Sequence, residues 1–278
     1  MRVSRFLLAC LIVGSSSLNA QALMASPQTA QAYAQQTPEP IKSDPQAIAL
    51  LAQAVAALQG AATITDVTLS GSARRVAGSD DETGSAVFKA IVDGSSKLTL
   101  NLPSGTHSEV RANSDNGPVG SWSGPDGMSH PLAYHNLFTD AGVLPTLLLV
   151  GFAKSSAVVS LVGPETRDGA NVLHLSAYQQ IAAFAGTDPS LSQRLSQTEI
   201  FLDATTLLPR AIAFNVHPDN DSLLDIPIVV DFSDYRSVKG AQVPFHIQKS
   251  INNSLALDLQ LSSAAINTGL STTDFKVQ

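Results

Sequence analysis

Residues 255–261 read LALDLQL, and this short stretch decides the fold class. A leucine stands at every second position, with small or polar residues between the leucines. Because successive side chains of a β-strand point to opposite faces of its sheet, the pattern predicts a strand with one buried face. Residues 98–102, 226–232 and 243–247 alternate in the same way. One-sided burial is typical of antiparallel sheets, so we expect an antiparallel β domain.

Similar segments extend in both directions from this stretch, separated by turns such as Asp93-Gly94 and Lys239-Gly240. They predict about 11 or 12 strands. These strands lie near residues 65–76, 84–93, 96–103, 106–113, 117–123, 155–163, 170–178, 196–203, 209–217, 225–235, 241–250 and 254–266. A sheet of so many one-sided strands has to curve, and its concave face needs a cover. The predicted fold class is therefore mainly β (α+β): a single curved antiparallel sheet, or incomplete β-barrel, with an N-terminal helix and a short helical lid.

The N-terminal helix is expected just before the first strand. Ser43 or Asp44 can cap its N-terminus, Pro45 fits its first turn, and Gly60 ends it. Apolar residues recur between them at helical spacing, at Ile48, Leu51, Val55 and Leu58. The pattern predicts one amphipathic helix of about four turns.

Residues 131–154, PLAYHNLFTDAGVLPTLLLVGFAK, interrupt the β pattern. The segment is apolar on most sides and contains Gly142 and Pro145, so it predicts two short helices. A helix that is apolar nearly all round needs cover on both sides, which favours a position across the mouth of the curved sheet. Packing of the same residues into a solid core fits the sequence equally well.

A hollow beneath this insert would be suited to acyl chains or to an apolar segment of a partner. The candidate ligand-binding residues are Trp122, Leu144, Leu147, Leu148, Val150 and Phe152.

The first 43 residues are expected to lie outside the folded domain. Residues 1–25 have the features of a cleavable secretory signal peptide: two arginines, an apolar run, and small residues at the end. The run is too short to span a bilayer, and it continues past Cys10, so we expect neither a transmembrane segment in the mature chain nor acylation of this cysteine. Residues 26–43 are rich in Gln, Ala and Pro and predict a disordered linker. The folded domain is predicted to span 44–278, in a periplasmic protein.

Charge and cysteine content exclude several classes of function. The chain has 16 basic and 23 acidic residues; the signal contains two of the basic residues and no acidic one, so the remainder has a net charge of −9. Nucleic-acid binding requires clustered basic residues, and the densest cluster is the pair Arg74-Arg75. The single cysteine belongs to the signal, which excludes disulfides and thiolate metal sites from the mature chain. No glycine-rich phosphate loop is found, and we expect no cofactor.

Motifs for catalysis are weak. Residues 120–124 read GSWSG, but Trp122 occupies the central position that a nucleophile elbow gives to serine. Ser121 and Ser123 therefore offer only a remote route to a hydrolase. His130 and His135 are five residues apart, whereas a helical two-histidine metal site needs a spacing of four.

Motifs for metal binding are weak as well. The loop HPDNDSLLD contains Asp219, Asp221 and Asp225, but leucines stand where a calcium loop needs an oxygen ligand and a glycine. We expect a polar hairpin loop without metal. The remaining histidines and candidate acids are scattered singly over predicted strands, at His107, His174, His217, His246, Glu109, Glu165 and Glu199. No catalytic or metal-binding residue is predicted.

Three C-terminal segments carry a family resemblance: FLDATTLLPRAI (201–212), DFSDYRSVKGAQVPFHIQ (231–248) and AAINTGLSTTDFKV (264–277). With the order of elements along residues 44–278, they resemble the periplasmic lipoprotein-carrier (LolA/LolB-like) superfamily. The resemblance implies an incomplete β-barrel closed by a few helices over an apolar cavity.

The sequence departs from that superfamily at one position. True lipoprotein carriers place an arginine beside a proline on an early strand, where it holds the lid closed. The corresponding stretch of this sequence offers only Lys89 and Lys97, and Arg74 or Arg75 is the available substitute. The carrier mechanism therefore cannot be transferred from the resemblance alone.

The predicted function is that of a non-enzymatic exported protein that binds an apolar ligand, such as a lipid or acylated protein, in a half-barrel cavity. The alternative is an interaction or sensor module that binds another envelope protein through the same face or by strand addition. A hydrolase is the third hypothesis.

Overall fold

The structure is a computed structural model, and its described residues belong to one unit that spans residues 41–278. The described residues are 42–114, 116–139, 144–181 and 189–277. The predicted signal peptide, and the predicted linker up to residue 41, lie outside them.

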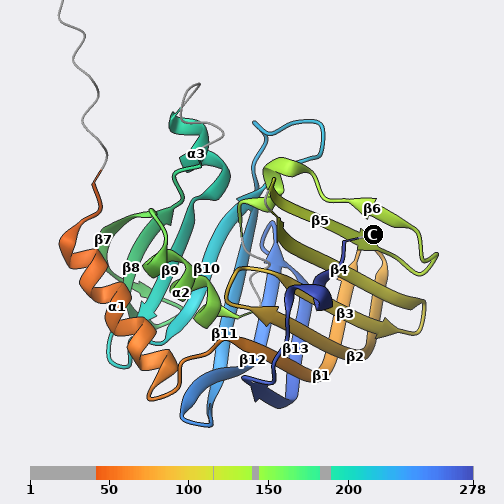
Figure 1. Ribbon diagram of the computed structural model, residues 1–278, viewed down its shortest axis with the longest axis horizontal. Helices are drawn as coiled ribbons and strands as arrows, with labels where there is room; N and C mark the ends of the chain where they lie inside the picture. The colour runs from red at the N-terminus through yellow and green to blue at the C-terminus, as the bar shows by residue number, and fades with distance from the viewer. Residues whose placement is uncertain (1–41, 115, 140–143, 182–188, 278) are drawn as a thin grey trace, which may run out of the picture. The chain divides into compact units, whose positions relative to one another are not determined.

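One antiparallel sheet of 13 strands forms the framework (Figure 1). The first half, from one end of the sheet to its centre, contains β6 (Ser129–Pro131), β5 (Gly117–Ser123), β4 (Gly105–Ser114), β3 (Ser96–Leu102), β2 (Asp80–Ile91) and β1 (Asp66–Ala77). The second half continues with β13 (Ser254–Ile266), β12 (Ala241–Ile251), β11 (Ile226–Val238), β10 (Pro209–Val216), β9 (Thr198–Asp203), β8 (Ala170–Tyr178) and β7 (Val158–Arg167). The sheet is curved and open, with β6 and β7 as its two ends, which confirms the predicted fold class.

All twelve predicted strands are present, and the described residues add three elements that were not predicted: β6, a helix after β8, and a one-turn helix at Thr272–Phe275. Strand β6 has only three residues, too few to show an alternating pattern. Helix α3 (Pro189–Ser196) follows β8 in a stretch to which no element was assigned.

The centre of the sheet joins the first strand to the last. Strand β1 pairs with β13, so that Ser70 lies opposite Ser263. The Asp66 carboxylate, at the start of β1, accepts hydrogen bonds of 2.7 Å from the Thr268 backbone N–H and hydroxyl and one of 3.0 Å from the Gly269 N–H. These contacts fix the chain just beyond β13 onto β1.

Helix α1 (Pro45–Gln59) has the predicted limits. The Asp44 side chain accepts a hydrogen bond from the Gln46 N–H at 2.8 Å, and Gly60 ends the helix with a φ of 55°, a conformation that favours glycine. The predicted apolar face is wrong in part, because Ile48 is 50% exposed and Val55 is only partly buried. The buried residues are Ala47, Leu51, Ala54 and Leu58. Two alanines on this face allow close packing of the helix against its neighbours.

Helices α1 and α2 (Pro145–Lys154) lie on the same face of the sheet, as Figure 1 shows. They share one large cluster of buried apolar residues with the inward side chains of both halves of the sheet. The one-turn helix η3 (Thr272–Phe275) ends with Phe275, which is buried in a separate small cluster with Ile91 and Val110.

Candidate functional site

Helix α2 belongs to the insert that follows β6 and is buried on nearly all sides. Pro145 stands in its first turn, where the missing N–H removes no hydrogen bond. Seven of its ten residues are buried, and α1 packs against it. The helix is therefore covered on most sides, as expected from its apolar sequence. The first part of the insert forms the short 3-10 helix η1 (Tyr134–Leu137).

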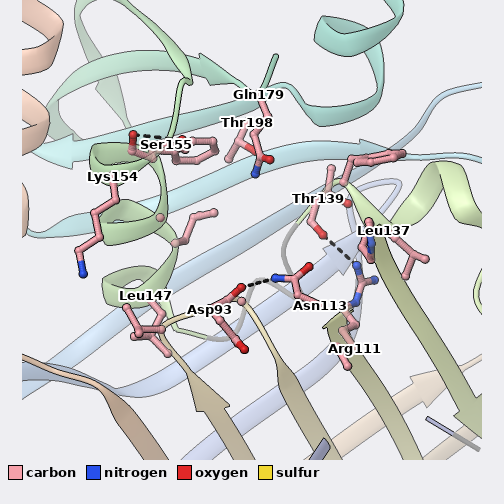
Figure 2. Close-up of a pocket in the computed structure, with 18 of the residues that line it drawn as sticks. Asp93, Arg111, Asn113, Leu137, Thr139, Leu147, Lys154, Ser155, Gln179 and Thr198 are labelled. Carbon is pink, nitrogen blue, oxygen red and sulfur yellow. Dashed lines mark hydrogen bonds between the residues drawn. The ribbon is translucent and has the colours of Figure 1, made fainter. Parts of the chain in front are cut away.

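A cavity of about 450 Å³ lies beside α2. Leu147, Leu148 and Phe152 of α2 form an apolar wall. Figure 2 shows α2 on one side of this cavity, with Arg111 and Thr139 on the opposite side. The other described residues around it include Val92, Asp93, Asn113, Val119, Leu137, Phe138, Lys154, Gln179, Ile181 and Thr198. The site combines a leucine-rich wall with a polar rim, which is the usual make-up of a ligand pocket.

The six predicted ligand-binding residues fall into three groups. Leu147, Leu148 and Phe152 line the cavity. Leu144 and Val150 are buried but are not among the residues that line it. Trp122, on β5, is 44% exposed and lies opposite Glu109 of β4. Its ring stacks on the His130 ring, with 4.4 Å between the ring centroids. The structure thus brings the α2 residues together at the cavity and places Trp122 apart from them.

Arg111 on β4 joins the sheet to the insert. Its Nη1 donates hydrogen bonds to the backbone oxygens of Asn136 (3.0 Å) and Thr139 (2.8 Å), and its Nε donates to Glu109 Oε1 at 2.7 Å. The Arg111 side chain is only 13% exposed. Charge-assisted hydrogen bonds to two carbonyls hold η1 and the residues after it against β4, where they form the cavity wall.

Glu109 keeps its charge beside this arginine. Burial on its own would raise the pKa of the Glu109 carboxyl. The charges of Arg111 and Lys249, and the hydrogen bond from Arg111, bring that pKa below its ordinary value. Glu109 therefore remains an ionised partner that orients the guanidinium towards the insert.

A second attachment holds the insert from the other half of the sheet. The Asn136 side chain donates to the His217 backbone oxygen (2.7 Å) and accepts from the His217 N–H (2.8 Å). His135 Nε2 lies 3.0 Å from the Pro218 backbone oxygen. Arg111 holds this short segment from β4, and Asn136 within the segment bonds to His217. Helix η1 therefore bridges the β4 side of the sheet and the loop after β10.

Comparison with known proteins rests on structure, since no family model and no curated protein matches the sequence. A domain from Vibrio parahaemolyticus named for outer membrane lipoprotein sorting is 12% identical over 83% of this chain and 96% of its own, with a TM-score of 0.54. A LolA superfamily protein from Nitrosomonas europaea is 12% identical over 83% and 97% of the two chains, with a TM-score of 0.53. The chain shares the fold of these two proteins.

A DUF1329 family protein from Desulfovibrio piger matches at the same level, with 15% identity over 84% of this chain and 99% of its own and a TM-score of 0.54. The fold shared with these proteins is the one that the predicted resemblance implied. The likeness establishes the fold and leaves the function to be argued from the site.

In this structure, Arg111 donates hydrogen bonds to the insert. Arg74, one of the two substitutes considered from sequence, instead pairs with Asp81 at 2.6 Å across the hairpin of β1 and β2. Sequence reasoning missed Arg111 because it sought an arginine on earlier strands. The available signal was its position two residues after Glu109 on one predicted strand, which puts both side chains on the same face.

Two of the three carboxylates in the loop that was compared with a calcium loop have structural partners. Asp225 Oδ1 lies 2.6 Å from Arg194 Nη2 of α3, and Asp221 Oδ1 accepts a hydrogen bond from the Leu223 N–H at 2.9 Å. Of the two serines considered for a hydrolase, Ser121 is buried and Ser123 Oγ lies 2.9 Å from Ser108 Oγ.

No helix in the described part of the chain combines the length and the apolar character needed to cross a bilayer.

Proposed function

We propose that this protein binds an apolar ligand, the acyl chain of a lipid or of a lipid-modified protein, in the cavity beside α2. The observation that carries the proposal is the apolar wall of Leu147, Leu148 and Phe152 on a cavity of about 450 Å³. Burial of ligand hydrocarbon against this wall would supply roughly 25 cal/mol per Å² of apolar area. The names of two proteins with the same fold, which refer to lipoprotein sorting and to the LolA superfamily, support this choice of ligand.

The insert is proposed to act as the movable wall of the site. Its attachments are a few hydrogen bonds: Arg111 donates to the backbone oxygens of Asn136 and Thr139, and the Asn136 side chain donates to and accepts from the His217 backbone. Release of these bonds would let η1 move without disturbing the hydrogen-bonded ladder of the sheet. The ligand is bound and released at this cavity and is not converted there.

We further propose that the protein is exported to the periplasm. The support is the N-terminal segment from Arg2 to Ala25, which has the order of regions found in secretory signals. N-terminal sequencing of protein from a periplasmic extract should begin close to residue 26, and a mature protein that retains Met1 would contradict export.

The ligand proposal is tested by native mass spectrometry of the purified protein and its Leu148→Asp variant. The wild type should carry co-purifying lipid, and the variant should lose it while keeping the β signal in circular dichroism, because a carboxylate in the wall disfavours hydrocarbon. Leu223→Asp is the matched control, since Leu223 is 75% exposed on the loop after β10. A wild type without bound lipid, or equal lipid content in both variants, would exclude this function.

A second candidate is an envelope protein interaction module. Large apolar side chains are exposed in the region from β5 to η1: Val119, Trp122, Met128 and Tyr134. Exposed apolar residues gathered in one part of a surface are typical of protein interfaces. Capture of a specific envelope protein by the wild type, and its loss in Trp122→Ala, would favour this function over lipid binding.

A further inference from the structure

Ser233, His246 and Asp258 come together on the face of the sheet opposite the cavity. They lie on β11, β12 and β13, and Ser233 is the direct cross-strand neighbour of His246. The residues next to each of them in sequence, such as Phe232, Ile247 and Leu259, belong to the large buried cluster. Side chains alternate along a strand, so the three polar residues point to the other face.

The hydrogen bonds among these residues define the state of the histidine. His246 Nε2 lies 3.1 Å from Asp258 Oδ1, and His246 Nδ1 lies 3.2 Å from Ser233 Oγ. Gln248 and Gln260 also donate to the Asp258 carboxylate, at 2.9 and 3.3 Å. A carboxylate only accepts hydrogen bonds, so in the neutral imidazole Nε2 carries the proton and the lone pair of Nδ1 accepts from the Ser233 hydroxyl.

A small pocket adjoins this serine. Its volume is about 260 Å³, and Ser233 and Gln248 line it together with Arg167, Arg210, Asp168 and Asp231. Arg167 Nε is buried and has no hydrogen-bond partner among the described residues, although it lies 3.8 Å from Asp168 Oδ2, and Nη2 of the same guanidinium lies 3.7 Å from Asp231 Oδ1. The guanidinium stacks over the Phe201 ring at 4.6 Å. An unused N–H in a pocket that contains a hydroxyl is a donor available to a ligand oxygen.

We propose that this outer pocket is an acyl-transfer site, with Ser233 as nucleophile and His246 as general base. Serine, histidine and carboxylate in a chain of hydrogen bonds are the groups that activate a hydroxyl, and they are recognised by geometry and not by their order in the sequence. The imidazole is turned end for end relative to the usual triad, since the serine meets Nδ1. Either ring nitrogen has the lone pair needed to accept the proton.

The reaction is the hydrolysis of a carboxylic ester. Ser233 Oγ forms a bond to the acyl carbon as its proton moves to His246 Nδ1, and Asp258 stabilises the resulting imidazolium. The bond to the leaving alcohol then breaks, and the alcohol takes the proton from Nδ1. Water next attacks the acyl carbon and gives one proton to Nδ1, which returns it to Ser233 as the carboxylic acid leaves. Arg167, which lines the same pocket as Ser233, is the proposed donor to the developing oxyanion.

The pocket also limits the substrate class. Arg167 and Arg210 are balanced in charge by Asp168 and Asp231, so the lining as a whole is neutral. Its volume suits a short acyl group. An uncharged ester with a short acyl chain is therefore the expected substrate, in contrast to the long acyl chains proposed for the cavity on the other face. The two proposals concern different surfaces and are independent.

The test uses a fluorophosphonate probe and p-nitrophenyl acetate with the full chain. Mass spectrometry should locate the probe on Ser233, and Ser233→Ala and His246→Gln should each lower labelling and ester hydrolysis by at least about 100-fold. Ser237→Ala, an exposed serine on the same strand, is the matched control and should react like the wild type. A wild type that is not labelled at Ser233, or equal labelling of the Ser233→Ala variant, would overturn the proposal.

Asp258 is a positioning residue, and its role can be separated from a structural one. Asp258→Asn can donate to Nε2 and so turn the imidazole to the tautomer that cannot accept the serine proton, whereas Asp258→Glu should restore part of the labelling rate. If Ser233→Ala fails to fold, Ser233→Cys keeps the proposal testable, because the thiol beside His246 should react with iodoacetamide faster than the thiol of Ser237→Cys. Equal rates for the two thiols would contradict an activating histidine.

Discussion

Helices α1 and α2 cover the same face of the sheet, yet they are built for different purposes. Helix α1 has one buried side, with Leu51 and Leu58 at most 2% exposed, and its other side faces solvent. Helix α2 is buried on nearly every side, but one of its sides borders a hollow instead of packed side chains. An apolar sequence alone therefore does not distinguish a core helix from the wall of a binding site.

The first prediction tests whether the buried side of α1 is tightly packed, and it has the largest expected change in stability. Leu58→Ala should lower the free energy of unfolding by about 2–5 kcal/mol, because the fully buried side chain leaves a cavity that its neighbours cannot fill. Ile48→Ala on the exposed side of the same helix should change it by less than about 0.5 kcal/mol. Urea titrations measure both, and similar losses would mean that α1 does not pack as described.

The second prediction concerns α2 itself, where two adjacent leucines face different surroundings. Leu149 is fully buried, whereas Leu148 lines the cavity. Leu149→Ala should cost about 2–5 kcal/mol of stability, and Leu148→Ala should cost less because part of its surface already lacks packed neighbours. Thermal unfolding of the two variants is the measurement. Equal losses would show that the space beside α2 is filled.

The next experiment concerns the attachment of the insert. Arg111→Leu removes charge-assisted hydrogen bonds to two backbone oxygens, so amide exchange at residues 136–139 should become about 10- to 100-fold faster. Arg74→Leu is the matched control, because that arginine forms an exposed ion pair of little energetic value. Unchanged exchange in Arg111→Leu would show that the insert is held by other contacts.

The smallest effect is expected from Asp66, at the start of β1 in the centre of the sheet. Burial alone would raise the pKa of the Asp66 carboxyl, but the hydrogen bonds from Thr268, Gly269 and Thr65 lower it below its ordinary value. A lowered pKa in the folded state adds stability above the unfolded value near 3.9, and this contribution is lost as the pH falls through the folded value.

The Asp66→Asn variant should therefore be less stable than the wild type at neutral pH, and the gap should shrink below about pH 4. Chemical denaturation at several pH values measures the gap. A constant difference from pH 7 to pH 3 would assign the effect of Asp66 to hydrogen bonding by either protonation state.

Local sequence signals were sufficient for most of the fold. Period-two alternation located twelve strands, and Asp44, Pro45 and Gly60 fixed the ends of α1. Strand β6 escaped because three residues show no period, and the buried face of α1 was misassigned because it uses Ala47 and Ala54 where larger Ile48 and Val55 were expected. Small residues that permit close packing are visible only once the partner surface is known.

The site was predictable only in part. The apolar character of 144–152 indicated α2 as a wall, whereas the contacts of Arg111 and Asn136 depend on chain segments more than 20 and 80 residues away. The proximity of Ser233 to His246 could have been predicted from the sequence more readily. Counting residues outward from the turn at Lys239-Gly240 places Ser233 opposite His246. The pair could therefore have been predicted by assigning each histidine its cross-strand neighbour.

The pairing of β1 with β13 sets the order in which the molecule can be completed. Ser262 Oγ donates to the Ser70 backbone oxygen across 192 residues, and closing so long a loop is slow and entropically costly. A growing chain can form the two halves of the sheet separately through local turns, but the inner edge of each half stays unpaired until the final strand has been synthesised. Removal of β13 by truncation at the C-terminus would therefore separate the two halves of the sheet and leave two unpaired strand edges that promote aggregation.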